Sequence, residues 1–228
     1  MSGSPRCGSG ETLLSARLIV FDLDGTLIDG YAAIGDALAY AMTRLGLEAP
    51  GPREVRSMVG HGLESLLAQA AGPELAAEGV RLFRTRYPEV AVPKSELLPG
   101  VPEVLSALEA RGHLLALASN KPPDFSRLIL EAKGIARHFR AVEGPGPSTP
   151  AKPDPAMLHR AMRQANVAAH ETLVVGDMEV DSEFARAAGC GVVLIPGGSR
   201  SREELEGVDA DALLDTITHL PEWLRARS

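Results

Sequence analysis

The sequence predicts an α/β fold, with a Rossmann-like parallel sheet flanked by helices and an all-helical domain inserted into it. Three observations lead to this fold class. Short apolar runs of strand length recur along the chain, helical patterns separate the later runs, and one long stretch after the first run has no strand pattern. The four apolar runs are 17–21, 113–118, 172–175 and 191–195.

Each apolar run is nearly continuous rather than alternating. This pattern is typical of a strand that is buried on both faces of a parallel sheet. Helical patterns lie between the runs, at 104–110, 126–133, 156–165 and 182–188. Alternation of strands and helices indicates βαβ units, and these units build parallel sheets.

The stretch from Gly30 to Leu98 breaks this alternation. Apolar residues near its start follow helical spacing, at Ile34, Leu38, Met42 and Leu45. We therefore expect three parts in the chain. They are a flexible tail at 1–16, a Rossmann-like core at 17–29 and 99–228, and a helical insert at 30–98.

Composition and charge exclude several classes of protein. The 228 residues carry a formal net charge of −7, and nucleic-acid affinity depends on clustered Lys and Arg, so no nucleic-acid partner is expected. Two cysteines, Cys7 and Cys190, do not indicate a disulfide framework. No apolar run has the length of a membrane span, and the N-terminus lacks the apolar segment of a secretory signal. We expect a cytoplasmic monomer or homodimer without a membrane partner.

Small polar or acidic residues follow three of the apolar runs. Asp22 and Asp24 follow the first run, Ser119 and Asn120 follow the second, and Asp177 follows the third. Ligands of open parallel sheets bind at the carboxyl ends of the strands. These five side chains are therefore expected to meet in one crevice.

The acidic residues of this set favour a hard cation. Asp22 and Asp24 are close enough to repel each other, so they would bind a cation or share a proton. With Asp177 they offer only oxygen atoms, which suits Mg²⁺. Zinc is not expected, because the sequence has no Cys/His cluster. Gly25 allows the backbone to turn sharply after the strand.

The remaining polar residues of the crevice favour an anion. Ser119 and Asn120 precede a helix, and a helix N-terminus with a hydroxyl and an amide beside it binds anions. Simple N-capping explains this segment equally well when it is taken alone. Pro153 keeps Lys152 extended, so Lys152 can point into the crevice, although most lysines are solvated. Asp181 can hold Lys152 or a metal-bound water.

These motifs, in this order, resemble the phosphatases of the haloacid dehalogenase superfamily. They are DLDGT at 22–26, Ser119-Asn120, Lys152 before Pro153, and GDMEVD at 176–181. The segments 59–63, 98–101 and 118–122 look most like the phosphoglycolate phosphatase branch. The resemblance covers nearly the whole chain after the tail, and the helical insert looks like the cap of this superfamily.

The resemblance implies a two-step phosphoryl transfer with Mg²⁺ as cofactor. Asp22 is the nucleophile and Asp24 the general acid and base. Asp22, the Asp24 backbone carbonyl and Asp177 hold the metal. Four residues hold the phosphate oxygens: Leu23 through its backbone, Ser119, Asn120 and Lys152. Three residues support the site: Gly25, Thr26 and Asp181.

The expected substrate is a small phosphorylated metabolite, with 2-phosphoglycolate as the leading candidate and His61 as a possible contact from the cap. A sugar-phosphate mutase, a pyrophosphate or nucleotide phosphatase, and a non-catalytic binding protein are the alternatives. The chain departs from the family at Met178, where a small polar residue is usual, and at Gly30, where serine is common.

Overall fold

A six-stranded parallel sheet forms the centre of the computed structural model, which describes residues 16–227. In sheet order, its strands are β5 (Phe139–Glu143), β4 (Leu114–Ala118), β1 (Leu18–Phe21), β6 (Thr172–Gly176), β7 (Gly191–Leu194) and β8 (Ala212–Leu213). Each neighbouring pair is parallel. The predicted α/β class is therefore confirmed.

Strand β1 lies in the middle of this sheet, between β4 and β6, and all four of its residues are buried. Successive side chains of a strand point to opposite faces. Accordingly, Ile19 and Phe21 belong to one apolar cluster, and Leu18 and Val20 belong to another. The continuous apolar run in the sequence reflects this burial on both faces.

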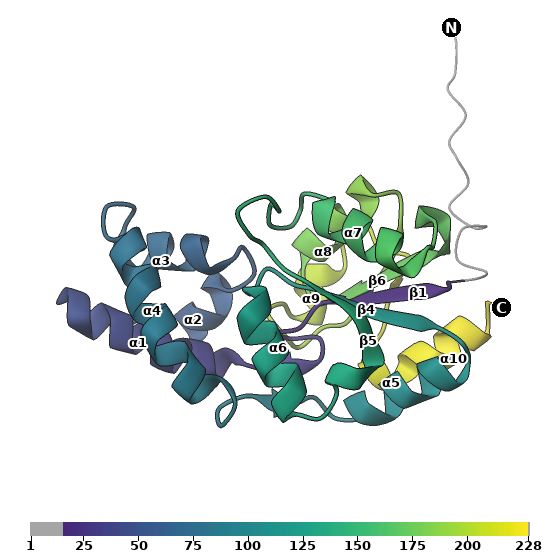
Figure 1. The fold of residues 1–228 in the computed structure, drawn as a ribbon, viewed down its shortest axis with the longest axis horizontal. Helices are drawn as coiled ribbons and strands as arrows, with labels where there is room; N and C mark the ends of the chain where they lie inside the picture. Colours follow the sequence, from purple (N-terminus) through teal and green to yellow (C-terminus); the bar gives the residue numbers. More distant parts are fainter. Residues whose placement is uncertain (1–15, 228) are drawn as a thin grey trace, which may run out of the picture.

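Helices cover both faces of the sheet (Figure 1). The cluster around Val20 includes residues of α7 (Ala156–Ala165), α8 (Glu179–Ala187) and α9 (Arg202–Leu205). The cluster around Phe21 includes residues of α5 (Val101–Ala110), α6 (Pro123–Ala132) and α10 (Leu220–Arg225). Three short 3-10 helices lie in the connections: η1 (Ala136–His138), η2 (Ala169–Glu171) and η3 (Ile217–His219).

A second group of helices lies beside the sheet and forms the cap (Figure 1). Its members are α1 (Tyr31–Leu45), α2 (Pro52–Met58), α3 (Leu63–Ala71) and α4 (Ala76–Ala91). Ile34 and Leu38 of α1 are buried in the same cluster as Phe83 of α4. The cap helices therefore bury apolar faces, as the helical spacing in the sequence predicted, and these faces belong to the same cluster as Phe21 of the core.

Two short strands connect the cap to the core. β2 (Ile28–Asp29) pairs with β3 (Glu96–Leu97) in antiparallel fashion. β3 lies inside the range 30–98 that was expected to be all-helical, so this expectation was wrong for two residues. A two-residue strand is too short to produce a periodic pattern.

The predicted tail lies outside the described residues, except for Ala16. Ala16 is buried, and its carbonyl oxygen accepts a hydrogen bond from His113 Nδ1 at 2.7 Å. Within residues 16–227, the helices lack the combination of length and apolar character that crossing a bilayer requires.

Candidate active site

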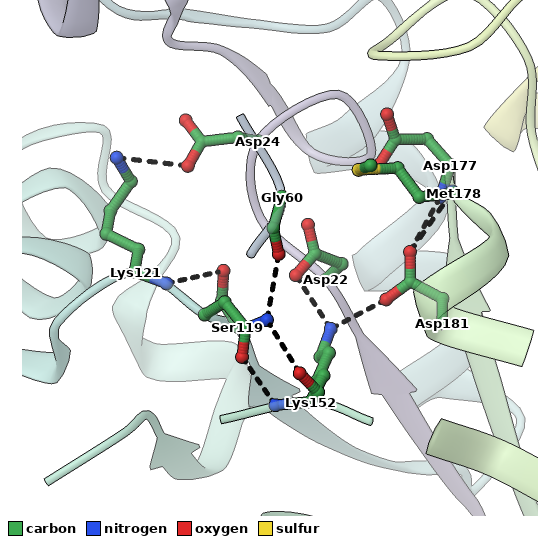
Figure 2. Close-up of polar contacts among 10 residues, drawn as sticks. Asp22, Asp24, Gly60, Ser119, Lys121, Lys152, Asp177, Met178 and Asp181 are labelled. Carbon is green, nitrogen blue, oxygen red and sulfur yellow. Dashed lines mark hydrogen bonds and ion pairs between the residues drawn. The ribbon is translucent and has the colours of Figure 1, made fainter. Parts of the chain in front are cut away.

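The carboxyl ends of β1, β4 and β6 bring together the residues predicted from the sequence (Figure 2). Asp22 follows β1, Ser119 follows β4 and Asp177 follows β6. The strands β4 and β6 are the two neighbours of β1, so their ends lie on either side of Asp22. Adjacent strands of a parallel sheet present their carboxyl ends at one edge, which explains this convergence.

Lys152 lies between two carboxylates (Figure 2). Its Nζ donates to Asp22 Oδ1 at 2.8 Å and to Asp181 Oδ1 at 2.7 Å. The exposed side-chain fraction is 1% for Lys152, 13% for Asp22 and 2% for Asp181. Burial disfavours the charged lysine, but the two carboxylates outweigh this effect and raise its pKa. Lys152 is therefore an ammonium ion beside Asp22.

Asp181 fixes the start of the helix that follows β6. Its Oδ2 accepts hydrogen bonds from the backbone N–H groups of Asp177 and Met178, each at 3.2 Å. The bond with Met178, the N-cap residue, is the backbone part of a capping box, and the bond with Asp177 holds the residue before it. The other oxygen of Asp181 binds Lys152. One side chain thus links the position of Asp177 to that of Lys152.

Asp24 is paired with a lysine that the sequence analysis did not assign to the site. Lys121 Nζ lies 3.0 Å from Asp24 Oδ2 and donates to the Tyr87 hydroxyl at 2.6 Å. Both charged side chains are buried, with 6% and 8% exposed. Burial raises the pKa of Asp24, and Lys121 opposes this shift. In the sequence, the one indication for Lys121 is its position directly after the strand-end residues Ser119 and Asn120.

Asn120 uses its side chain to join three segments. Its Nδ2 donates to Gly60 O at 2.8 Å and to Lys152 O at 3.3 Å, and its Oδ1 accepts from Lys152 N at 2.6 Å. Gly60 belongs to the cap, so Asn120 bridges the cap and the lysine loop. Ser119 Oγ accepts from Lys121 N at 3.3 Å. The phosphate-binding roles given to both residues remain predictions.

The turn after β1 requires glycine at position 25. Gly25 has φ +87°, and a Cβ there would lie 2.3 Å from Asp177 Oδ2. Leu23 is buried, and its carbonyl accepts hydrogen bonds from Leu27 and Ile28 that close the turn. Thr26 is buried, and its Oγ1 has no partner among the described residues.

The comparisons with known proteins agree with this geometry. Residues 19–195 match the family model described as haloacid dehalogenase-like hydrolase. The chain belongs to this family. It is 36% identical over 200 residues to a phosphoglycolate phosphatase of Mesorhizobium japonicum, and the match covers 85% of this chain and 88% of the relative. A phosphoglycolate phosphatase of Vibrio parahaemolyticus is 34% identical, with 90% of this chain and 95% of the relative covered.

Solved structures show the same fold. A predicted phosphoglycolate phosphatase from Haemophilus somnus superposes with a TM-score of 0.84 at 28% identity, and 91% of this chain and 97% of that chain are covered. A predicted phosphatase from Clostridium acetobutylicum has a TM-score of 0.85 at 23% identity, with 93% and 99% covered. The prediction of a haloacid dehalogenase-like hydrolase that resembles the phosphoglycolate phosphatases is confirmed.

The acidic residues of this hydrolase fit a hard divalent cation. Asp22, Asp24, Asp177 and Asp181 supply four carboxyl groups, and Lys121 and Lys152 supply two ammonium groups, so the acidic groups outnumber the basic ones by two. Asp177 Oδ1 is buried and has no partner among the described residues. Burial, together with Asp181 and Asp22, raises the pKa of Asp177 well above its usual value. A cation at Asp177 would relieve both the desolvation and the repulsion.

The donor set fits Mg²⁺ better than a transition metal. Within residues 16–227, no group of three His, Cys, Asp or Glu side chains is arranged around a metal position. Mg²⁺ keeps several of its waters and is usually bound by only one or two carboxylates. Asp22 and Asp177, with the backbone carbonyl of Asp24, match this requirement. The assignment of the metal remains a prediction.

An open cavity lies between the core and the cap. The polar lining residues all belong to the core and include Asp22, Asp24, Ser119, Asn120, Lys121 and Lys152, and four apolar core residues line the cavity beside them: Pro122, Phe125, Met178 and Val180. On the cap side, the described lining residues are apolar or glycine: Ile34, Val59, Gly60, Gly62, Leu63, Leu66 and Phe83. The charged residues of the described lining therefore lie on the core side of the cavity, and the cap side is apolar.

The cap loop that carries His61 approaches the core through glycine rather than through the imidazole. His61 is exposed, and the residues that line the cavity include Gly60 and Gly62 but not His61. Gly60 has φ +128°, and a Cβ there would lie 2.4 Å from Met178 Sδ. The structure thus does not place His61 at the cavity. Met178, which departs from the family pattern, instead packs against the cap.

Proposed function

We propose that this hydrolase is a Mg²⁺-dependent phosphatase that removes phosphate from a small phosphate monoester, with 2-phosphoglycolate as the leading candidate. One observation carries the proposal. The Asp22 carboxylate, at the end of the central strand, lines the cavity and is paired with a buried ammonium group at 2.8 Å. A carboxylate nucleophile next to a fixed cation is the arrangement that transfer of an anionic phosphoryl group requires.

In the first step, an Asp22 oxygen attacks phosphorus, and the bond between phosphorus and the leaving oxygen breaks. An aspartyl phosphate forms on Asp22. Asp24 gives its proton to the leaving alkoxide, which departs as an alcohol. Burial supports this role, because it raises the pKa of Asp24 and favours the protonated form.

In the second step, water hydrolyses the aspartyl phosphate. Asp24, now ionised, accepts a proton from the water, whose oxygen attacks phosphorus and releases Asp22. Lys121 stabilises the ionised Asp24 in this step, since its ammonium lies 3.0 Å from the carboxylate. Phosphate leaves, and the proton on Asp24 restores the starting state.

Charge is the main obstacle to the first step. Two like charges about 4 Å apart repel by about 4 kcal/mol at an effective dielectric constant of about 20. When bound by Asp22, the Asp24 carbonyl and Asp177, Mg²⁺ would neutralise part of this charge. Lys152 supplies further positive charge beside Asp22, and its buried position keeps the ammonium fixed.

The choice of 2-phosphoglycolate is supported by the relatives and by the cavity. The relatives from M. japonicum and V. parahaemolyticus are named phosphoglycolate phosphatases. The cavity lining includes Lys121 besides Lys152, so a second cation faces a leaving group that carries a carboxylate. Closure of the apolar cap residues over a bound substrate would expel water, which would strengthen the interactions of both lysines with an anionic substrate.

A sugar-phosphate mutase is the second candidate within the family. A solved structure of a CbbY mutant from Rhodobacter sphaeroides, in complex with xylulose-(1,5)bisphosphate, has a TM-score of 0.76 at 23% identity, which is a likeness of fold alone. A bisphosphate needs a second site for a doubly charged phosphate, and beyond Lys152 the described lining offers a single ammonium group, that of Lys121. The cavity therefore favours hydrolysis of a monophosphate over isomerisation.

The test is phosphate release from a panel of small phosphate esters, with and without Mg²⁺. We expect turnover of 2-phosphoglycolate that EDTA abolishes. Asp22→Asn is expected to lose turnover while circular dichroism and the melting temperature show a folded protein. Activity retained in Asp22→Asn would remove this residue from the nucleophile role. An isomerised phosphate product without free phosphate would support the mutase instead.

A further inference from the structure

A loop of the core contacts both Asp177 and the turn that follows the nucleophile strand. The loop, residues 197–199, follows β7. Ser199 N donates to Asp177 Oδ2 at 2.5 Å. A Cβ at Gly198 would lie 2.2 Å from the same oxygen and 2.5 Å from Gly25 Cα. The loop backbone is thus in direct contact with one oxygen of Asp177, while Oδ1 has no partner among the described residues.

The same loop is held from the cap by Arg56, which lies on α2. Arg56 Nη1 donates to Gly198 O at 2.7 Å and, in a longer bond, to Gly197 O at 3.4 Å. The guanidinium lies 4.0 Å above the ring of Tyr31, the first residue of α1. The Tyr31 hydroxyl is 2.8 Å from Ser199 Oγ. Two cap residues therefore contact the loop at adjacent positions.

The core holds the loop at its other end. Arg200 forms two hydrogen bonds with Glu179, from Nε at 3.0 Å and from Nη2 at 2.7 Å. Gly197 N also donates to Arg200 O at 2.8 Å. Arg200 therefore fixes the end of the loop, whereas Arg56 fixes Gly197 and Gly198, next to Asp177.

We propose that Arg56 is a positioning residue for the divalent cation: it holds the 197–199 loop against Asp177, so that Asp177 presents its free oxygen to the metal. This inference rests on the proposed function, because it assumes the Mg²⁺ site at Asp177. It adds that docking of the cap on the core and affinity for the metal are coupled. Groups that orient a metal ligand from outside the ligand shell affect metal affinity strongly.

The hydrogen bonds to the loop, rather than a surface ion pair, explain the placement of Arg56. Its ion pair with Asp29 is long, at 3.7 Å, and both side chains are exposed, by 39% and 50%. Such pairs contribute little to stability. Arg53 lies on the same helix and is exposed, so it provides a matched arginine away from the loop.

The experiment compares Mg²⁺ binding to the substrate-free chain by isothermal titration calorimetry. Arg56→Met keeps an unbranched side chain but removes the guanidinium and with it every donor. We expect its dissociation constant for Mg²⁺ to rise about tenfold, the lower end of the effect of outer-shell partners. Arg56→Lys, which retains a single donor group, is expected to recover part of the affinity, and Arg53→Met to match the wild type.

Melting temperatures in EDTA separate this role from a general loss of stability. The inference requires weaker Mg²⁺ binding in Arg56→Met with a melting temperature in EDTA close to that of the wild type. Equal affinity in Arg56→Met and wild type would overturn this inference alone. If the wild type itself bound no Mg²⁺, both the proposed metal site and this inference would be overturned.

Discussion

Lys152 is the residue on which the charge balance around the nucleophile depends. It is 1% exposed and contacts Asp22 and Asp181 at once. Removing one partner of a buried ion pair leaves the other charge without compensation, which costs more than the pair itself contributes. Lys152 is therefore expected to affect both catalysis and folding.

Lys152→Met tests both effects. We expect kcat to fall by about 10²–10³, the range for losing one electrostatic contact to a transition state. We also expect the free energy of unfolding to fall by about 3–5 kcal/mol, since the buried Asp181 and the partly buried Asp22 would both lose their cation. Steady-state kinetics and urea unfolding measure the two quantities. Lys133→Met, at a partly exposed lysine paired loosely with Glu96 at 3.9 Å, is the control.

Tyr87 supports Lys121 from the cap. The hydroxyl accepts from Lys121 Nζ at 2.6 Å, and the ring stacks on Phe83 with centroids 5.0 Å apart. Tyr87→Phe keeps the packing but leaves the buried ammonium short of one acceptor. We expect a loss of about 1–3 kcal/mol in the free energy of unfolding, measured in urea. Tyr40→Phe, at a partly buried cap tyrosine, should change it by less than about 0.5 kcal/mol.

Among single residues, the sequence allowed the site residues that directly follow buried strands to be predicted. Asp22 and Asp177 follow long apolar runs, so their convergence could be deduced from sheet geometry. Lys121 could not be assigned in this way, because its partner Tyr87 is 34 residues away on the cap. The contacts of the Asn120 amide with Gly60 and Lys152 depend on tertiary placement in the same way.

Among the elements, the loop between α2 and α3 makes a close contact between cap and core. Gly60 has φ +128° and approaches Met178, while its carbonyl accepts from Asn120 at 2.8 Å. A side chain at this position would displace the loop from the cavity. Since Asn120 also binds the backbone of Lys152, we expect this displacement to extend to Lys152.

Gly60→Ala is therefore expected to raise KM for the phosphate ester and to lower kcat. Its Cβ would lie 2.4 Å from Met178 Sδ. Gly72→Ala controls for backbone strain, because Gly72 has φ +80° but its Cβ would meet nothing within 4 Å. If the Met178 contact is the cause, adding Met178→Ala to Gly60→Ala should restore part of the activity. Identical kinetics for Gly60→Ala and Gly72→Ala would contradict this explanation.

The elements that could be predicted are those with strong periodic patterns. The buried strands β1, β4, β6 and β7 coincide with four apolar runs, since each is covered on both faces. The edge strands β5 and β8 were not predicted. Strand β5 carries two charged residues, the exposed Arg140 and the buried Glu143, and β8 has two residues, so neither yields a continuous apolar run.

For the molecule as a whole, the candidate metal site is a source of instability when no cation is bound. Asp177 is buried next to Asp181 and Asp22, and its pKa is raised well above the ordinary value of 3.8. Between 3.8 and this raised pKa, the folded chain binds more protons at Asp177 than the unfolded chain does. The contribution of Asp177 to the free energy of unfolding is therefore greatest at low pH. It falls as pH rises through the pKa of Asp177 in the folded chain.

Mg²⁺ and Asp177→Asn should both relieve this instability, by different routes. In EDTA at neutral pH, Asp177→Asn is expected to be more stable than the wild type. The difference in the free energy of unfolding should shrink as pH falls, because the Asp177 carboxylate of the wild type is then protonated and neutral. Mg²⁺ at 100 times its dissociation constant should stabilise the wild type by about 2.7 kcal/mol and the variant by much less. Asp124→Asn, at a carboxylate 58% exposed, is the control. Urea unfolding at several pH values measures the free energy of unfolding in each case. Equal stability of the wild type and Asp177→Asn in EDTA at neutral pH would show that the buried Asp177 carboxylate does not destabilise the metal-free chain.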